Sequence, residues 1–422
     1  MPADTARPAP HVFIVAGEES GDRLGAALIR ALRARTRAFP GEVETGSPSG
    51  NAINQKLGAI RFSGVGGTHM ASEGVPSLFP LGDLAIIGFT AIVARLPSIL
   101  ARIRQTADAV IAAKPDILVI VDSPEFTHRV ARRVRARAPH IPIVDYVCPS
   151  VWAWRSGRAK AMRAYVDHVL ALLPFEPDTL KRLGGPPSTY VGHPLIEQVG
   201  ALRAADPAAR LSGPARLLVL PGSRSGEIRR MAPVFGDALG KVVAEAGPLE
   251  VIVPAVPRLV PAVQEAVAAW PVPARIVTDT EEKHVAFRTA RAALSKSGTS
   301  TLELALAGVP MVTAYKLSLL EEAVGRLLIK VKTVILPNLV LGEQAVPEFL
   351  QRDATPERLA AALLPLLRDT PERRRQTEAF ARLDAIMGVG GEAPSDRAAA
   401  AVQACLANQS PRESVASGPA RA

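Results

Sequence analysis

The stretch AALSKSGTSTLELALAGVPMV, residues 292–312, restricts the fold and the function more than any other part of the chain. A short apolar strand leads into a turn of glycine and small hydroxyl residues, and a helix follows with Glu303 in its first turn. Unpaired N–H groups at a helix start bind anions such as phosphate, and a carboxylate can accept hydrogen bonds from a ribose diol. A helix cap with a capping-box Glu explains the same residues equally well.

The composition of the 422 residues favours buried parallel strands flanked by helices. Hydrophobic residues make up 48% of the chain and aromatic residues only 4%, so the core is built from Ala, Val, Leu and Ile. Two cysteines, Cys148 and Cys405, indicate neither a disulfide framework nor a zinc site, and they predict a reducing compartment. The net charge of +10 favours nucleic acid, anionic lipid or phosphorylated substrates as partners, and the scarcity of aromatic residues argues against single-stranded nucleic acid.

The N-terminal segment MPADTARPAPH contains no apolar signal core, and no run of about 18 apolar residues occurs in the chain. We therefore expect a cytoplasmic protein that no helix anchors across a membrane. The polar, low-hydrophobicity ends at 1–10 and 408–422 are expected to be disordered.

Strands and helices alternate along the chain, which favours α/β architecture with parallel sheets. In the first half we expect apolar strands at 11–16, 117–121, 143–147 and 169–173. After the polar break DPAARLSGP at 206–214 the pattern restarts, with strands expected at 217–220, 251–253, 275–277, 292–295 and 311–314.

This pattern predicts two Rossmann-like parallel-sheet domains, at 11–205 and 206–370, followed by C-terminal helices at 371–407. Ligands of such sheets bind outside the carboxyl ends of the strands. With two domains, those ends are expected to face each other across a cleft.

A second strand–turn–helix junction carries PGSRSGE at 221–227. Gly222 lets the backbone approach a ligand closely, and Arg224 is a bidentate donor suited to phosphate, although an ordinary turn with a surface arginine has the same sequence. Two such junctions in one domain suit a nucleotide diphosphate. The chain has neither a G-x-x-x-x-G-K-[ST] loop nor an Asp-x-Asp pair, so we expect no P-loop and no metal-held diphosphate.

Acidic residues follow two strands of the first half. Asp122, in VDSPE, comes directly after a strand, where a carboxylate can act as general base for a hydroxyl nucleophile. A helix N-cap explains Asp-Ser-Pro at least as well. Glu18, Ser20 and Asp22 raise the same ambiguity after the first strand: they either cap the helix expected at 24–35 or bind a polar acceptor.

The segment 83–104, DLAIIGFTAIVARLPSILARIR, repeats apolar residues at helical spacing. A core-facing helix explains most of them, and Pro97 is expected to interrupt or kink it. The alternative is an interfacial element that receives acyl chains and touches anionic lipid. The residues expected to make that contact are Ile86, Phe89, Ile92, Val93 and Leu96. The turn WAWR at 152–155 is either a further interfacial patch or structural.

Taken together and in order, motifs over roughly residues 11–385 resemble the lipid-A-disaccharide synthase family. The motifs are AGEESGD (16–22), FSGVGG (62–67), VDSPEF (121–126), PSVWAWR (149–155), LLPFE (172–176), VGHP (191–194), LPGSR (220–224), SGTSTLE (297–303) and LPNL (336–339).

The resemblance implies a glycosyltransferase of the GT-B type, with the site in the cleft between its domains. It implies UDP-2,3-diacylglucosamine as donor and 2,3-diacylglucosamine 1-phosphate as acceptor, joined with inversion to give lipid A disaccharide 1-phosphate and UDP. It also implies a peripheral protein on the cytoplasmic face of the inner membrane that needs no metal or other cofactor. Some members are dimers, so a homodimer is an expected assembly.

The resemblance also assigns roles to residues of this chain. Asp122 matches the general base, and Glu18 matches an acidic residue needed for activity. Residues that match the donor site are Gly222, Ser223, Arg224, Ser297, Gly298, Thr299, Thr301, Glu303 and Asn338. Ser20, Asp22 and the late polar residue Gln351 are expected near the acceptor or the donor.

Two other functions fit parts of the sequence. A UDP-sugar 2-epimerase of similar architecture would share the UDP turn and would have no use for the apolar segment. A non-catalytic protein that binds sugar nucleotides or lipids would bind UDP and release none from a donor.

Overall fold

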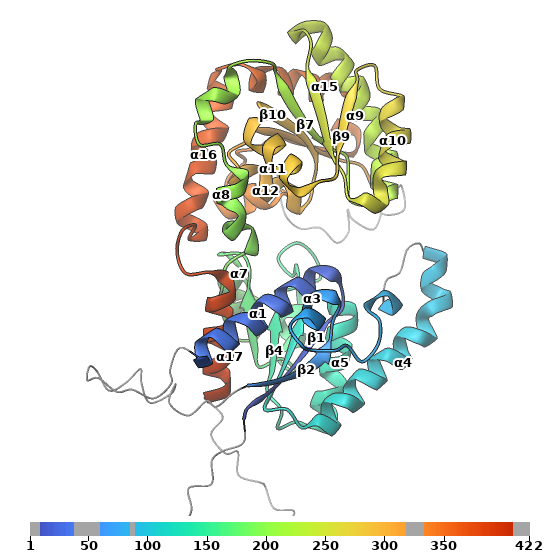
Figure 1. The fold of residues 1–422 in the computed structure, drawn as a ribbon, viewed down its shortest axis with the longest axis vertical. Coiled ribbons are helices and arrows are strands. Elements are labelled where there is room, and N and C mark those ends of the chain that lie inside the picture. Colours follow the sequence, from blue (N-terminus) through green and yellow to red (C-terminus); the bar gives the residue numbers. More distant parts are fainter. Residues whose placement is uncertain (1–8, 38–59, 85–88, 318–332, 408–422) are drawn as a thin grey trace, which may run out of the picture. The chain divides into compact units, whose positions relative to one another are not determined.

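The computed structural model describes residues 9–37, 60–84, 89–317 and 333–407, drawn in colour in Figure 1. They form two compact units, one made of residues up to Pro194 and from Glu392 onward, the other of Leu195–Gly391. Residues 1–8 and 408–422 of the predicted disordered ends lie outside the described residues. Pro10 does not fit that prediction, because its carbonyl accepts the N–H of Arg61 at 2.8 Å.

The first unit is built on a parallel sheet of six strands. They are β1 (His11–Ala16), β2 (Arg61–Val65), β3 (Ile117–Val121), β4 (Ile143–Tyr146), β5 (His168–Ala171) and β6 (Ser188–Tyr190). Their order in the sheet is β2-β1-β3-β4-β5-β6. The chain passes from β1 to β2 on one side and then to β3 on the other, so its direction reverses between β1 and β3.

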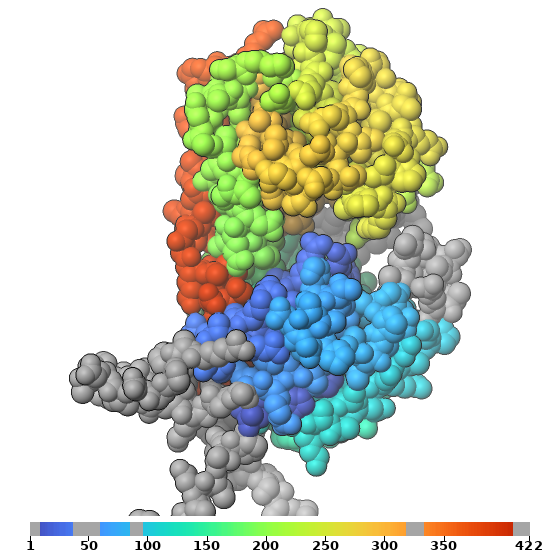
Figure 2. Space-filling model, viewed as in Figure 1, coloured from blue at the N-terminus to red at the C-terminus, as the bar shows by residue number. Residues whose placement is uncertain are grey.

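Helices cover both faces of this sheet because its side chains alternate between two apolar cores. Val12 and Ile14 share one core with helices α1 (Glu19–Arg37), α3 (Thr68–Ser72) and α17 (Pro394–Ala407). Phe13 and Val15 share the other with α4 (Phe89–Ala113), α5 (Pro124–Arg137), α6 (Gly157–Met162) and α7 (Glu176–Arg182). α3 and α17 both lie against α1 on the surface of this unit (Figure 2).

The second unit repeats this plan with another parallel six-stranded sheet. Its strands are β7 (Arg216–Leu220), β8 (Glu250–Pro254), β9 (Ala274–Val277), β10 (Ala292–Lys296), β11 (Met311–Tyr315) and β12 (Glu348–Leu350). They follow the order β12-β11-β10-β7-β8-β9, so the chain reverses direction between β7 and β10. The two turns that the sequence singles out for a diphosphate follow these two neighbouring strands.

The helices of the second unit also form two layers. One apolar core joins the sheet to α9 (Ser225–Ala246), α10 (Val260–Ala268) and α15 (Pro356–Leu363). On the opposite face, α11 (Thr280–Thr289) and α12 (Thr299–Leu306) pack on β7 and β10. α8 (Val199–Leu202) packs on α11, while α14 (Leu336–Leu341) and α16 (Pro371–Met387) pack on α12. In the described part of the chain, no helix has the length and apolar character to cross a bilayer.

The boundary between the units lies after Pro194, upstream of the break at 206–214 that the sequence suggests. Arg203 donates to the Leu306 carbonyl at 2.7 Å and Arg210 to the Ala307 carbonyl at 2.7 Å, and these bonds tie the preceding segment to the second unit. The predicted C-terminal helices also divide, because α16 packs in the second unit and α17 packs on α1 in the first.

Two helices differ from the sequence-based expectation. α1 begins at Glu19, five residues before the predicted start at 24, so Ser20 and Asp22 lie in its first turns. Pro97 lies inside α4 and does not interrupt it, so of the two expected effects only a kink remains. Proline removes one hydrogen bond from the ladder, and the helix continues because Ile103 and its neighbours pack on the sheet.

Gly64 provides a test of the β1–β2 pairing. A Cβ on Gly64 would lie 1.9 Å from the Ile14 carbonyl oxygen, so even alanine requires the two strands to separate. We expect Gly64→Ala to lower the free energy of unfolding of the first unit by about 3 kcal/mol or more. Gly82→Ala is the control, because a Cβ on Gly82 meets no atom within 4 Å. Equal stability of the two variants in urea unfolding would contradict this packing.

Candidate functional site

Asp122 directly follows β3 and has an unusual backbone conformation. Its φ is +54° and that of Ser123 is +46°, both in the left-handed region that costs a non-glycine residue about 1 kcal/mol or more. Three hydrogen bonds hold this turn: Asp122 N–H to the Tyr146 carbonyl (3.0 Å), Ser123 N–H to Asp122 Oδ1 (2.7 Å) and the Thr127 hydroxyl to the Asp122 carbonyl (2.6 Å). These hydrogen bonds hold the strained backbone in place and so fix the position of the Asp122 carboxylate.

Ser20 meets Asp122 from the neighbouring strand end. Its hydroxyl, in the first turn of α1, donates to Asp122 Oδ2 at 2.8 Å. The approach requires glycine at position 17, because a Cβ there would lie 2.6 Å from the Cβ of Ser123. The structure thus brings together the two acidic loops that the sequence places at adjacent strand ends.

The carboxylate of Asp122 does not cap α5, contrary to the alternative reading of Asp-Ser-Pro. The cap position is Ser123, and no side-chain cap hydrogen bond forms there. The Asp122 side chain is half-buried, and each of its oxygens accepts one of the two hydrogen bonds described above. Carboxylate oxygens can accept more than one donor, so this geometry leaves room for a substrate hydroxyl.

Glu18 and Asp22 have different surroundings although they are four residues apart. Glu18 is exposed beside the start of α1. Asp22 is 1% exposed, and its carboxylate accepts backbone N–H groups of Gly67 (2.7 Å), His69 (2.9 Å) and Met70 (3.0 Å) at the start of α3. Asp22 therefore caps α3 and joins it to α1, and it is not open to an acceptor as one of our two readings allowed.

Sequence reasoning missed a buried polar group behind Asp122. Asp145, in the middle of β4, is 1% exposed and lies 3.0 Å from His128 Nε2 through Oδ2. The other ring nitrogen of His128 lies 3.1 Å from the Tyr165 hydroxyl. Burial raises the pKa of Asp145, and His128 opposes that shift. A single Asp inside an apolar strand is the only sequence signal for this group.

Glu176 is a second buried carboxylate of the first unit that sequence reasoning missed. It is 3% exposed at the start of α7 and accepts the N–H groups of Leu172 (3.0 Å) and Leu173 (2.9 Å) and the indole N–H of Trp152 (3.3 Å). Burial raises the pKa of Glu176 to about 7, although these donors favour the charged form. Glu176 thus joins the loop after β4 to the end of β5.

In the second unit, the turn after β7 wraps around Glu227. This carboxylate is 3% exposed and accepts the Ser223 N–H at 3.0 Å and the Lys296 ammonium at 3.1 Å. Gly222 has φ +150°, and a Cβ on it would lie 2.5 Å from the Cβ of Glu227. Arg224 is paired with Glu227 at 3.6 Å, yet 80% of its side chain is exposed and open to a ligand.

The turn after β10 does not form the capping box that competes with the ligand-binding interpretation. Glu303 is 8% exposed and accepts a 2.5 Å hydrogen bond from Lys283, and no side chain caps α12. Thr301 donates to the Gly298 carbonyl at 2.7 Å, and the Ser297 hydroxyl to Glu348 at 3.4 Å. These bonds fix the turn and leave Thr299 exposed at the helix start.

The two late polar residues differ in what they offer a ligand. Asn338 is 2% exposed, and its amide both donates to and accepts from the backbone of Val346 at 2.9 Å, so it braces the chain and does not present a free group to a donor sugar nucleotide. Gln351 follows β12 with φ +53° and accepts the Leu317 N–H at 2.8 Å. Its Nε2 is buried with no hydrogen-bond partner among the described residues.

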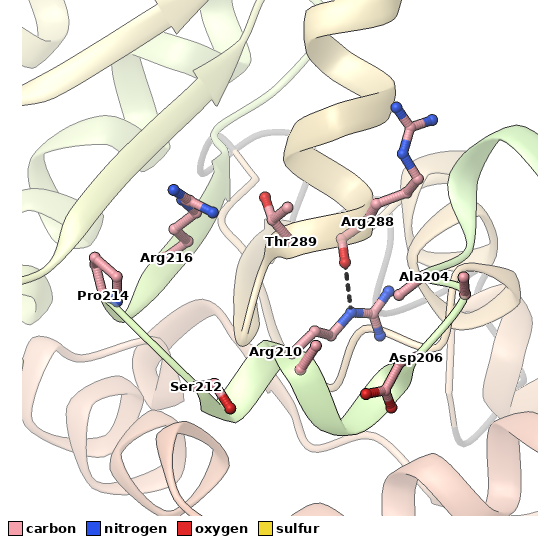
Figure 3. Close-up of a pocket in the computed structure, with 10 residues that line it drawn as sticks. Ala204, Asp206, Arg210, Ser212, Pro214, Arg216, Arg288 and Thr289 are labelled. Atoms are coloured by element: carbon pink, nitrogen blue, oxygen red, sulfur yellow. Dashed lines mark hydrogen bonds between the residues drawn. The ribbon is translucent and has the colours of Figure 1, made fainter.

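A separate hollow of about 250 Å³ lies away from these turns in the second unit (Figure 3). Arg216, at the start of β7, lines it, as do Arg288 and Thr289 just before β10. It therefore lies at the amino ends of these strands. Its Arg210 is 4% exposed and donates to backbone carbonyls, including that of Arg288 at 3.1 Å, which indicates a structural role.

The comparisons with known proteins indicate one and the same family over nearly the whole chain. The model of a family described as Lipid-A-disaccharide synthetase matches residues 12–389. A lipid-A-disaccharide synthase of Nitrobacter hamburgensis is 58% identical over 390 residues, which cover 92% of this chain and 93% of the relative. The chain belongs to the lipid-A-disaccharide synthase family. A further member, from Bradyrhizobium diazoefficiens, is 55% identical, with 94% of this chain and 97% of the relative covered.

The solved structures confirm the predicted GT-B class of two parallel α/β units. MurG of Acinetobacter baumannii matches with a TM-score of 0.55 at 15% identity, covering 94% of this chain and 99% of MurG. A UDP-GlcNAc 2-epimerase of Neisseria meningitidis, bound to UDP-GlcNAc, matches with a TM-score of 0.56 at 11% identity, covering 94% and 99%. At these identities the likeness shows the fold alone. Family membership makes the chain a glycosyltransferase of lipid A biosynthesis.

The raised pKa of Glu176 predicts a pH-dependent stability of the first unit. A carboxyl whose pKa is higher in the folded than in the unfolded chain contributes stability that is complete below about pH 4.5 and is lost as the pH rises through about 7. We expect urea unfolding to show a loss of roughly 3 kcal/mol over that interval that Glu176→Gln does not show. Glu392→Gln, at an exposed carboxylate, should keep the wild-type slope. Equal slopes in all three proteins would contradict the assignment.

Proposed function

We propose that this chain transfers a 2,3-diacylglucosamine unit from UDP-2,3-diacylglucosamine to the 6-hydroxyl of 2,3-diacylglucosamine 1-phosphate. The products are the β-1,6-linked disaccharide 1-phosphate and UDP. Family membership supports a UDP-sugar donor and the lipid A pathway. The observation that carries the mechanism is the hydrogen-bonded pair Ser20–Asp122, which lies where the first sheet reverses direction.

Asp122 acts as the general base in this scheme. An acceptor hydroxyl has a pKa far above neutral, so a base within about 2.6–3.2 Å must take its proton as the new bond forms. The acceptor oxygen attacks the anomeric carbon, its proton passes to Asp122, and the bond to UDP breaks with its electron pair on the leaving phosphate oxygen. One displacement of this kind inverts the anomeric configuration. The Ser20 hydroxyl and the Ser123 N–H each hold one carboxylate oxygen, and each oxygen can accept a further hydrogen bond from the acceptor hydroxyl.

The departing UDP gathers negative charge, which the second unit is suited to stabilise. Arg224 is exposed beside the N-terminus of the long helix α9, and the turn at 297–301 precedes α12. Guanidinium groups and helix N-termini stabilise phosphate without a metal ion. Glu303, with one oxygen taken by Lys283, has a second oxygen for the ribose diol.

Substitution of Asp122 tests the assignment of the base. We expect Asp122→Asn to reduce UDP release from the two diacylated sugars at least about 100-fold, because the amide cannot take the proton. UDP binding, measured by calorimetry, should stay unchanged. Asp108→Asn is a matched control, since Asp108 is an exposed carboxylate of the same unit paired with Arg137. Turnover near that of the wild type in Asp122→Asn would show that the mechanism is wrong.

The epimerase alternative is not favoured. The epimerases among the structural relatives share the fold at 11–14% identity, whereas the lipid-A-disaccharide synthases are 42–58% identical to this chain. An epimerase would convert a single UDP-sugar without any acceptor. The same UDP assay, run with and without the acceptor, distinguishes the two reactions, because only the transferase releases UDP when the acceptor is added.

We also propose that the N-terminal part of α4 contacts the cytoplasmic face of the inner membrane. Leu96 is 43% exposed, whereas Ile103, two turns later, is fully buried, so the apolar stripe leaves the core toward the helix start. Arg102 does not serve the membrane as a flanking charge, because it is paired with Asp83 at 2.5 Å. Ile86 lies outside the described residues, and so do the side chains of Phe89, Ile92 and Val93.

The WAWR turn offers one residue for the same surface. Trp152 donates to Glu176 and its ring packs edge-on against Phe175, so it is structural. Trp154 is 37% exposed with the guanidinium of Arg155 4.4 Å from its ring centroid. An exposed indole beside a cation is suited to the headgroup region of an anionic bilayer.

Vesicle co-sedimentation tests the membrane proposal. A triple variant, Ile86→Ser with Phe89→Ser and Leu96→Ser, should lose most of its binding to anionic phospholipid vesicles, because it loses apolar area that a bilayer would bury. Val285→Ser is the control, since Val285 is 42% exposed on α11 of the other unit. Unchanged co-sedimentation of the triple variant would remove the membrane role from α4.

A further inference from the structure

Lys296 is a cation at the proposed donor site to which the sequence motifs give no role. It is the last residue of β10, which pairs with β7 so that Ser295 lies opposite Leu220. The turns after these two strands contain the residues that we propose to bind the diphosphate. The ammonium of Lys296 therefore lies at the point where the second sheet reverses direction.

One carboxylate oxygen orients both cations of this edge. Glu227 Oε1 lies 3.1 Å from the Lys296 ammonium and 3.6 Å from the Arg224 guanidinium. Burial alone would raise the pKa of Glu227, but Lys296, the Ser223 N–H and Arg224 outweigh it and hold the pKa below its usual range. The three charges leave an excess of one positive charge next to the N-terminus of α9, where Glu227 and Lys296 are largely buried and Arg224 is exposed.

The surroundings of the ammonium direct it toward the turn after β10. Its stem is largely buried, with 16% of the side chain exposed, and the ammonium lies 5.2 Å from the centroid of the Tyr315 ring. A Cβ on Gly298 would lie 3.1 Å from Lys296 Nζ, so the ammonium reaches the turn where a phosphate is expected. An ammonium has three N–H donors, and Glu227 uses one of them.

We propose that Lys296 is a second phosphate-binding residue of the donor site, which Glu227 orients to contact the diphosphate of the leaving UDP together with Arg224. The proposal rests on the proposed function in that a nucleoside diphosphate must be the leaving group. Lys296 then binds the diphosphate in the donor and stabilises the charge that it gains as the sugar–oxygen bond breaks.

A structural role for Lys296 is the competing explanation, because a buried carboxylate such as Glu227 needs a cation beside it. The two explanations predict different behaviour in a double variant. Lys296→Met with Glu227→Gln removes one charge of each sign and keeps the net charge of the cluster. Because Glu227 also pairs with Arg224, the single variant Glu227→Gln is the reference: if Lys296 only neutralises Glu227, the double variant binds UDP as Glu227→Gln does. If Lys296 contacts phosphate, its binding stays weak.

Calorimetry with UDP and with uridine measures the contact directly. We expect Lys296→Met to weaken UDP binding about tenfold or more, since a charge-assisted hydrogen bond is lost, and to leave uridine binding unchanged. The double variant should remain as weak as Lys296→Met. Lys241→Met is the control: Lys241, on α9, is exposed and paired with Glu357 on α15, and this variant should bind both ligands as the wild type does. Thermal unfolding of each variant checks that the second unit is folded.

Four results would overturn the proposal. UDP affinity of the double variant restored to that of Glu227→Gln, or equal loss of uridine and UDP affinity in Lys296→Met, would show a structural role. A preference for UDP over uridine that is as large in Lys296→Met as in the wild type would reject Lys296 and leave the donor assignment intact. A wild type that binds UDP no more tightly than uridine would reject the donor assignment as well.

Discussion

In a parallel sheet every strand ends at the same edge, and a reversal of chain direction leaves two neighbouring strand ends without a crossover helix between them. Both units use this constraint. In the first, the reversal lies between β1 and β3 and joins Ser20 to Asp122. In the second, it lies between β7 and β10 and joins Glu227 to Lys296. In each unit, the order of the strands therefore determines where the proposed functional residues lie.

At these junctions two backbone segments lie very close together, and glycine residues, which have no side chain, make this approach possible. Gly17 allows the loop after β1 to reach Ser123, and Gly222 allows the turn after β7 to fold over Glu227. The left-handed backbone at Asp122 costs free energy that the hydrogen bond from Thr127 and the ladder bond to Tyr146 offset. A polar residue is kept in a strained position only where surrounding contacts fix it, which favours a functional over a purely structural Asp122.

Periodicity in the sequence predicts the strands well, because fully buried parallel strands such as Ile117–Val121 are continuous apolar runs. It also predicts that the turns at 221–227 and 297–301 belong to one domain. It does not separate ligand-binding polar residues from bracing ones: Asp22 and Asn338 have polar side chains in family motifs, yet both are saturated by backbone groups. Their partners lie in segments distant in sequence or in irregular loops, which no local pattern reveals. The boundary between the units differs from the predicted one for a similar reason, since Arg203 donates hydrogen bonds to a carbonyl about a hundred residues away.

Glu227 is buried, yet its negative charge is important for the two cations of the proposed diphosphate site. A diphosphate site made only of cations would repel its own members and leave each side chain free to move. A buried carboxylate beside both Arg224 and Lys296 offsets that repulsion, and its hydrogen bond holds Lys296 in place before a ligand arrives. Such preorganisation is what stabilises a leaving group at low cost, because the dipoles and charges need not rearrange as the bond breaks. In the first unit, the Ser20 hydroxyl orders the Asp122 carboxylate in the same way. In each unit, therefore, a charged group of the proposed reaction is held by a partner from the adjacent strand end: Asp122 by the neutral Ser20, and Lys296 by the oppositely charged Glu227.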